Sequence, residues 1–183
     1  MNTYFSYLKS RSKLSLFYRN FVLFPRIKYF TKRKNLDIGC GIGDYLKYDK
    51  NSIGVDINLD CVNYCKSLNL DCYQMKEDEL PFDSNIFDSI LLDNVLEHIE
   101  DPKLILKEIN RVLCPNGNFI IGVPCEKGYE HDNDHKQFYD IKKLKKLLNK
   151  DYLLKYYFYT PPFSYAFRKY FKQVALYAIF IKK

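Results

Sequence analysis

Three glycines at alternate positions place the strongest constraint on how this chain folds. They close the segment Leu36-Asp37-Ile38-Gly39-Cys40-Gly41-Ile42-Gly43, whose first residues have the apolar pattern of a buried strand. Glycine at these positions lets the backbone turn sharply and approach a ligand without a Cβ in the way. The segment therefore predicts a strand that ends in a ligand-binding turn.

A second strand ends in a carboxylate, Asp56, seventeen residues after Gly39. A carboxylate at the end of the second strand accepts hydrogen bonds from both ribose hydroxyls in nucleoside-binding α/β domains. NAD-binding domains use a related G-x-G-x-x-G turn in the same place, so these two features alone leave the cofactor open. The alternative role for Asp56 is structural, as a cap for a helix that begins near Asn58.

Short apolar runs alternate with helical patterns from residue 35 onward, which indicates an α/β fold. We expect a Rossmann-like, doubly wound, mostly parallel seven-stranded sheet that ends in an antiparallel strand pair. Strands are expected at residues 35–40, 52–57, 72–75, 87–93, 119–123, 152–160 and 174–181, and helices at 58–68, after the Asp101-Pro102 pair, and at 140–149.

The length of 183 residues fits one domain, which we expect to span residues 35–183. Residues 1–34 are expected to form a basic, aromatic helical segment that packs on this core. The apolar residues with helical spacing there are Leu14, Phe17, Tyr18, Phe21 and Val22, and Pro25 is expected to end or bend the helix.

Charge is unevenly distributed along the chain. Residues 1–36 hold nine Lys and Arg and no acid, residues 37–149 have a net charge of −8, and residues 150–183 have a net charge of +6. Basic flanks favour an anionic partner, such as membrane headgroups, a phosphorylated substrate or nucleic acid. The plainer interpretation is that flanking helices carry solvated lysines.

The apolar runs and the cysteines predict a cytoplasmic protein. No run reaches the ~18–20 apolar residues that span a bilayer, and basic residues interrupt the first thirty residues, unlike a signal peptide. The six cysteines have no metal-binding spacing such as C-x-x-C. Cys61 and Cys65 lie four residues apart in an expected helix, where we expect buried thiols.

Later motifs distinguish between the two nucleoside-binding families. Gly54-Val55-Asp56, Leu80-Pro81-Phe82, Phe87-Asp88-Ser89-Ile90, Val95 to Pro102 and the run Glu108 to Gly117 follow the glycine turn in order. Together, over about residues 35–149, they resemble class I S-adenosylmethionine-dependent methyltransferases of the type 11-like, small-molecule kind. These later motifs are not expected in an NAD-binding domain.

The resemblance implies a cofactor site for S-adenosylmethionine. It implies that Asp37 and the loop of Gly39, Cys40, Gly41 and Gly43 hold the methionine end, that Asp56 binds the ribose and that Ile57 lies against the adenine. Lys76 stands where this family usually has a small acidic residue, so Glu77 or Asp78 is expected to supply the adenine contact. Asp93 and Asn94 are expected to border the sulfonium and the substrate.

Three histidines are candidates for contact with the methyl acceptor. His131 and His135 lie in a polar segment directly after the fifth strand, and His98 follows the fourth. Ligands bind at this carboxyl edge in open α/β sheets, and a histidine there accepts a proton near neutral pH. We expect His135 and His98 to be catalytic; the alternative is that these histidines cap helices or tether loops.

A metal-assisted variant is the alternative enzyme hypothesis. Quinone-pathway and small-RNA O-methyltransferases, which resemble the chain at Glu97-His98, bind a divalent cation through Glu-x-x-Glu-His and a later histidine. Asn94 replaces the first glutamate here, so the main prediction includes no metal. Asn94, Glu97, His98 and His135 would form the weaker oxygen and imidazole site that suits Mg²⁺ or Mn²⁺.

These features predict a methyltransferase that acts on a small or lipid-linked molecule, with O-methylation of a sugar or cell-envelope intermediate as the first choice. Peripheral membrane contact through the flanks is part of this hypothesis, and nucleic acid is disfavoured because no RNA-binding module is recognisable. Aromatic and basic residues at helical spacing form one such flank: Phe163, Phe167, Arg168, Lys169, Tyr170, Phe171 and Lys172. A non-catalytic, cofactor-binding partner subunit is the third hypothesis.

Overall fold

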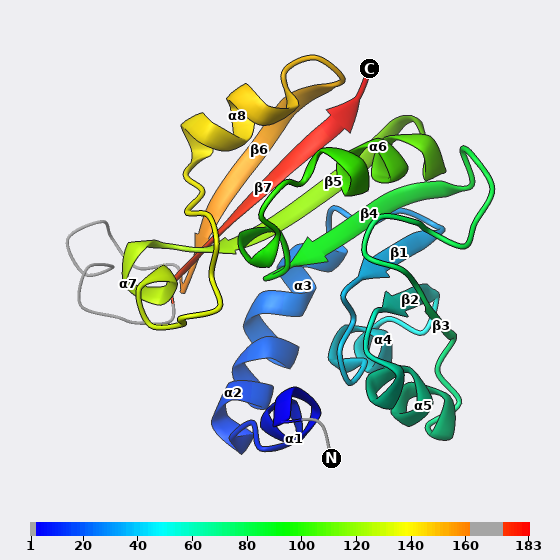
Figure 1. Cartoon of the computed structure of the whole chain (residues 1–183), viewed down its shortest axis with the longest axis vertical. Coiled ribbons are helices and arrows are strands. Elements are labelled where there is room, and N and C mark those ends of the chain that lie inside the picture. Colours follow the sequence, from blue (N-terminus) through cyan, green and yellow to red (C-terminus); the bar gives the residue numbers. More distant parts are fainter. Residues whose placement is uncertain (1–2, 162–173) are drawn as a thin grey trace.

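The computed structural model describes residues 3–161 and 174–183 (Figure 1). Its seven strands form one sheet in the order β3-β2-β1-β4-β5-β7-β6, with β7 antiparallel to both of its neighbours and the other pairs parallel. The strands are β1 (Asn35–Ile38), β2 (Ser52–Asp56), β3 (Cys72–Gln74), β4 (Phe87–Asp93), β5 (Leu113–Pro124), β6 (Tyr152–Thr160) and β7 (Ala175–Lys182). This arrangement confirms the predicted fold class.

Helices connect and cover these strands (Figure 1). They are α1 (Thr3–Lys9), α2 (Lys13–Tyr18), the π-helical turn η1 (Arg19–Leu23), α3 (Phe24–Lys28), α4 (Asp44–Tyr48), α5 (Leu59–Ser67), the 3₁₀ turn η2 (Leu96–His98), α6 (Lys103–Val112), α7 (Glu126–Tyr129) and α8 (Ile141–Leu148). Asn58 caps α5 by accepting from the backbone N–H groups of residues 60 and 61. Asp140 caps α8 in the same way, because its side chain accepts from the backbone N–H group of residue 143.

Alternate residues of the central strands enter two separate cores. In β4, Ile90 and Leu92 face the core that α6 and α8 cover, whereas Leu91 faces the core that α3 covers. The residues of β5 and β7 alternate between the two cores in the same way, so the central strands are buried on both faces of the sheet. Both cores hold β4 and β5, and the core covered by α6 and α8 also holds β1 through Leu36 and Ile38, so the carboxyl ends of the three strands stay in fixed register.

Two features of the chain differ from the sequence-based expectation. β5 begins at Leu113, six residues earlier than expected, because Asn116 adopts a left-handed φ of 60° and the pairing with β4 shifts register there. Pro25 does not end the first helical segment, because it lies in the first turn of α3, directly after the π-helical turn. Leu23 and Phe24 keep right-handed helical backbone angles, and the Phe24 amide donates to the Arg19 carbonyl, so the helical path continues up to the proline.

Of the set with helical spacing in the N-terminal segment, only Tyr18 packs against the core of the described residues, and most of the core contact comes from later residues. Leu23, Phe24 and Ile27 are buried in the α3-covered core. Leu14, Phe17 and Phe21 are 78%, 59% and 68% exposed. The expected aromatic and basic set at residues 163–172 lies outside the described residues.

Candidate active site

The glycine turn after β1 has the backbone shape that only glycine adopts easily. Gly39, Gly41 and Gly43 have φ values of +71°, +54° and +71°. A Cβ on Gly39 would lie 2.4 Å from Cγ2 of Val95. The amides of Gly39 and Cys40 donate to the carbonyl of Val55 at 2.8 and 3.0 Å, which fixes the turn to β2. The turn is therefore a rigid cradle, and a side chain at residue 39 would displace it by colliding with Val95.

Asp56 at the end of β2 is joined to this turn. Its Oδ2 accepts from the Gly41 amide at 2.7 Å, and its Oδ1 accepts from the Asn58 amide at 2.8 Å. The carboxylate is 4% exposed, and burial raises its pKa. Asp56 therefore orients the glycine turn and the start of the loop before α5, while Asn58 itself caps that helix. Ile57, the next residue, is 56% exposed beside it.

Asp37 and Asp93 form a buried acidic pair at the ends of β1 and β4. Burial, with the charge of Asp93 next in importance, raises the pKa of Asp37 well above its ordinary value. Arg19 compensates this charge, because its Nη2 lies 3.2 Å from Oδ2 of Asp93. The Tyr177 hydroxyl donates to Oδ1 of Asp93 at 2.5 Å, and the Asn94 side-chain amide donates to the same oxygen at 2.9 Å.

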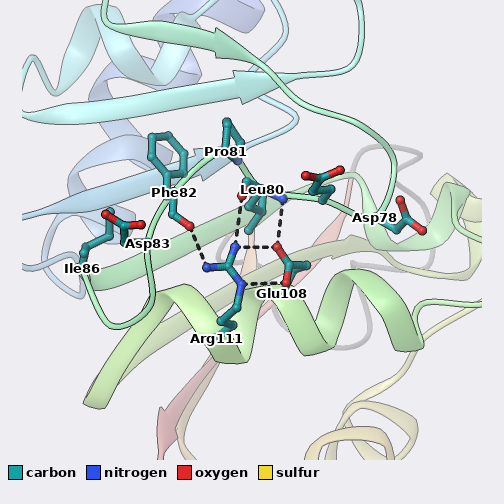
Figure 2. A pocket seen from close by; sticks show the side chains of 9 residues that line it. Asp78, Leu80, Pro81, Phe82, Asp83, Ile86, Glu108 and Arg111 are labelled. Carbon is teal, nitrogen blue, oxygen red and sulfur yellow. Dashed lines mark hydrogen bonds and ion pairs between the residues drawn. The ribbon is translucent and has the colours of Figure 1, made fainter.

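Glu77 and Asp78 lie in an exposed turn in which Lys76 pairs with Glu79 at 2.6 Å. Asp78 lines a groove of about 810 Å³ on the Leu80-Pro81-Phe82 loop (Figure 2). Arg111 holds this loop by donating to the carbonyls of Leu80 and Phe82 at 3.1 and 2.6 Å. The groove's lining includes none of the glycine-turn residues, so Asp78 faces a different surface from Asp56.

A carboxylate and two imidazoles meet beyond the end of β4. One ligand atom from each of Glu97, His98 and His135 lies within 4.8 Å of the others. Glu97 is 1% exposed, neither of its carboxylate oxygens has a hydrogen-bond partner among the described residues, and burial raises its pKa to about 8. Oε1 of Glu97 lies 4.0 Å from Nε2 of His135.

The orientation of His135 is set by its other ring nitrogen. Nδ1 lies 2.7 Å from the carbonyl oxygen of Tyr129, which only accepts, so Nδ1 carries the hydrogen. In the neutral imidazole, Nε2 is then a free acceptor that faces Glu97 and His98. The Glu97 carbonyl accepts from the amides of Lys136 and Gln137 at 2.7 and 3.1 Å, which fixes the histidine loop to η2.

His131 lies outside this group of three, in the exposed part of the same loop. Asn94 is exposed after the end of β4, and its φ is +54°. Its backbone N–H donates to the Gly122 carbonyl at 2.9 Å. The structure therefore brings His98 and His135 together, with Glu97 as a third member.

Helix α1 lies against the glycine turn. Phe5 and Leu8 are buried with Ile42 and Cys61, and a Cβ on Gly41 would lie 2.9 Å from Cδ1 of Leu8. Asp44, the first residue of α4, pairs with Arg11 at 2.5 Å. The N-terminal segment thus contributes Leu8, Arg11 and Arg19 to the surroundings of the site.

Sequence reasoning missed Arg19, Tyr177 and the part played by Glu97. Arg19 had no distinguishing signal among nine basic residues, and Tyr177 none among seventeen tyrosines. Glu97 was predicted only as a ligand of the alternative metal site. Its burial beside His135 depends on loop packing that no local pattern encodes.

An open α/β sheet with a glycine cradle, a carboxylate after β2 and polar groups at its carboxyl edge defines a nucleoside-cofactor-binding protein. Residues 36–121 match the model of a family described as a methyltransferase domain. Over these residues the chain is similar to methyltransferases, and it shares its fold with solved S-adenosylmethionine-dependent methyltransferases, such as one from Aquifex aeolicus (TM-score 0.73 over 98% of this chain and 97% of that one, 18% identity).

Relatives are similar over parts of their length. An uncharacterised protein of Methanocaldococcus jannaschii is 32% identical over 124 residues, covering 68% of this chain and 58% of the relative. A sterol 4-C-methyltransferase of Caenorhabditis elegans is 32% identical over 57% of this chain and 34% of its own. A probable tRNA methyltransferase 9B of Bos taurus is 28% identical over 75% of this chain and 30% of its own. The chain thus spans between about a third and three fifths of these relatives.

The fold matches solved structures over nearly the whole chain. A possible histamine N-methyltransferase from Thermotoga maritima superposes with a TM-score of 0.75 over 98% of this chain and 97% of its own, at 18% identity. Such a similarity shows a shared fold. Separately, no helix within residues 3–161 and 174–183 has the length and apolar character needed to cross a membrane.

Proposed function

We propose that the protein transfers a methyl group from S-adenosylmethionine to a small or lipid-linked acceptor. The glycine cradle carries this proposal, because its three glycines hold left-handed φ values and a Cβ at Gly39 would collide with the Val95 side chain. Asp56 is already oriented by the Gly41 amide, with its carboxylate at the end of β2. A cradle closed to side chains and a preset carboxylate fit a nucleoside cofactor.

The proposed cofactor-binding residues are Asp37, Gly39, Cys40, Gly41, Gly43, Asp56, Ile57, Asp93 and Asn94. Asp37 and Asp93 suit the positively charged methionine end, because two buried carboxylates share the single guanidinium of Arg19. Glu77 and Asp78 stay proposed adenine contacts, and the separate groove beside Asp78 makes them the weakest members of the set.

When bound, the cofactor supplies an activated methyl group, so the protein contributes mainly alignment and, for a hydroxyl acceptor, a base. We assign the base to His135, whose Nε2 is a free acceptor because Nδ1 donates to Tyr129. Glu97 and His98 adjoin that nitrogen. A hydroxyl proton therefore has an acceptor, which supports O-methylation, with a sugar or cell-envelope intermediate as the first acceptor to test.

The exposed side chains of Leu14, Phe17 and Phe21 support a lipid-linked acceptor and peripheral membrane contact. The basic residues of this flank support it less, because Arg11, Arg19 and Lys28 form ion pairs with Asp44, Asp93 and Asp49. An acceptor screen includes tRNA, because one relative is named as a probable tRNA methyltransferase. The proposed compartment is the cytoplasm, where cysteine thiols stay reduced.

Calorimetric titration tests the cofactor site through Asp56. We expect S-adenosylmethionine to bind the wild type and NADH not to bind. Asp56→Ala should weaken S-adenosylmethionine by about 1–3 kcal/mol, because charged hydrogen bonds are lost. Asp60→Ala is the matched control, since Asp60 is an exposed carboxylate in the first turn of α5. Equal affinities for the wild type and both variants would refute the assignment of Asp56.

Turnover tests the histidine assignment once an acceptor is found. His135→Ala should lower kcat by roughly 100-fold or more, as expected for loss of a general base, and should leave cofactor affinity unchanged. His131→Ala, in the same loop but exposed, should keep wild-type kcat. A parallel loss of cofactor affinity and turnover in His135→Ala would make His135 a structural residue.

A divalent cation at Glu97, His98 and His135 is the second candidate mechanism. The observation that favours it is the buried Glu97 carboxylate, which has two oxygens without partners facing two imidazoles. This mechanism predicts that EDTA abolishes turnover and that Mg²⁺ or Mn²⁺ restores it. Full turnover in EDTA would contradict the metal mechanism and would support His135 as a base that acts without a metal ion. Cofactor binding with no turnover on any acceptor would instead favour the non-catalytic partner subunit.

A further inference from the structure

Three buried cysteines meet beneath the glycine turn, apart from the histidine cluster. Cys40 lies in the turn, Cys65 on α5 and Cys72 at the start of β3, and their sulfur atoms all lie within 4.8 Å of one another. Sγ of Cys40 and Sγ of Cys72 are 3.5 Å apart. The three side chains are 9%, 0% and 2% exposed.

A glycine in β2 creates the space in which these sulfurs meet. Gly54 pairs with Cys72 in the sheet, and a Cβ on Gly54 would lie 2.8 Å from Sγ of Cys40. The surrounding side chains are Leu46, Val62 and Leu70, which are buried and apolar. The thiols therefore adjoin one another in a site without competing polar side chains.

The spacing of the three sulfur atoms fits an ion bound by three thiolates. An ion bonded to three thiolates at about 2.3 Å holds the sulfur atoms roughly 4 Å apart. Soft thiolate ligands select thiophilic ions such as Cu⁺ and Zn²⁺. Within the described residues no fourth Cys, His, Asp or Glu belongs to the group, and structural Zn²⁺ sites take four ligands. Three ligands therefore favour Cu⁺.

We propose that Cys40, Cys65 and Cys72 form a three-thiolate site for a thiophilic cation, with Cu⁺ as the ion that suits it best. Binding replaces S–H bonds with S–Cu bonds and releases the protons to solvent, and no electron is transferred. The site also adjoins the glycine turn, because Sγ of Cys65 donates to the Gly41 carbonyl at 3.4 Å.

The test is anaerobic titration of the whole protein with Cu⁺ in competition with a chromophoric Cu⁺ chelator. We expect one tightly bound ion per chain, and a rise in melting temperature because the ion binds the folded state. Cys72→Ser should lose both effects. Cys61→Ser is the matched control, since Cys61 is equally buried and lies one turn before Cys65 on α5.

Two results would overturn the site. One is the absence of tight Cu⁺ binding to the wild type. The other is equal Cu⁺ binding by Cys72→Ser and the wild type, which would assign the ion to the partly exposed Cys114 or Cys125. Tighter binding of Zn²⁺ than of Cu⁺ would overturn the choice of ion. If Cys72→Ser does not fold, Cys65→Ser replaces it, and circular dichroism establishes the folded state of every variant. These readouts do not depend on methyl transfer.

Discussion

Gly39→Ala is expected to bind S-adenosylmethionine roughly 100-fold more weakly than the wild type, a loss of about 3 kcal/mol. Two costs combine at this position. An alanine at a φ of +71° costs roughly 1–2 kcal/mol, and crowding in a packed site costs about 1–3 kcal/mol. The crowding arises because a Cβ would lie 2.4 Å from Cγ2 of Val95.

The turn relieves this strain by moving away from its native position, and the cofactor must restore that position in order to bind. The affinity therefore falls by about the free energy of the strain. Calorimetric titration measures the loss, and circular dichroism checks the fold. The double variant Gly39→Ala, Val95→Ala removes the clashing methyl groups and should recover part of the affinity. Wild-type affinity in Gly39→Ala would contradict the assignment of this turn to the cofactor.

Arg19→Met is expected to lower the free energy of unfolding by about 3 kcal/mol, the scale for breaking a buried ion pair on one side. Methionine keeps most of the side-chain volume and removes the charge. The loss leaves Asp37 and Asp93 close together without a cation, and Asp37 is already destabilised as an anion by burial. Urea denaturation at neutral pH measures the change.

Arg11→Met is the matched control for Arg19. Arg11 comes from the same basic segment and pairs with Asp44, but its side chain is 28% exposed against 19% for Arg19. Arg11 bonds one carboxylate rather than compensating a buried acidic pair, so its removal should cost roughly 1 kcal/mol or less. If Arg11→Met and Arg19→Met destabilise equally, the acidic pair is not the reason for the loss.

The parallel part of the fold was predictable because its signals are local. The strand Phe87–Asp93 appears at its expected bounds, since a continuous apolar run encodes a strand buried on both faces. Asn58 and Asp140 mark helix starts because a side chain that accepts from nearby amides needs no tertiary context. Short helices without such patterns, α4 and α7, were missed.

The site was predictable only where backbone shape determines residue type. Three alternate glycines show the turn directly, because their left-handed φ values favour glycine over residues with a side chain. Arg19 and Tyr177 reach Asp93 from 74 and 84 residues away, and such distant pairs leave no mark in a single sequence. The cysteine cluster has no motif spacing for the same reason, because its members come from a turn, a helix and a strand.

The contact between α1 and the glycine turn also has a consequence for the opening motions of the protein. A helix of seven residues is unstable alone, so α1 keeps its place mainly through Phe5 and Leu8. Such an element detaches locally at a lower free energy than the sheet unfolds. Each detachment uncovers Gly41, whose amide is bonded to Asp56. Hydrogen exchange at that amide should therefore follow the opening of α1 rather than motion of the sheet.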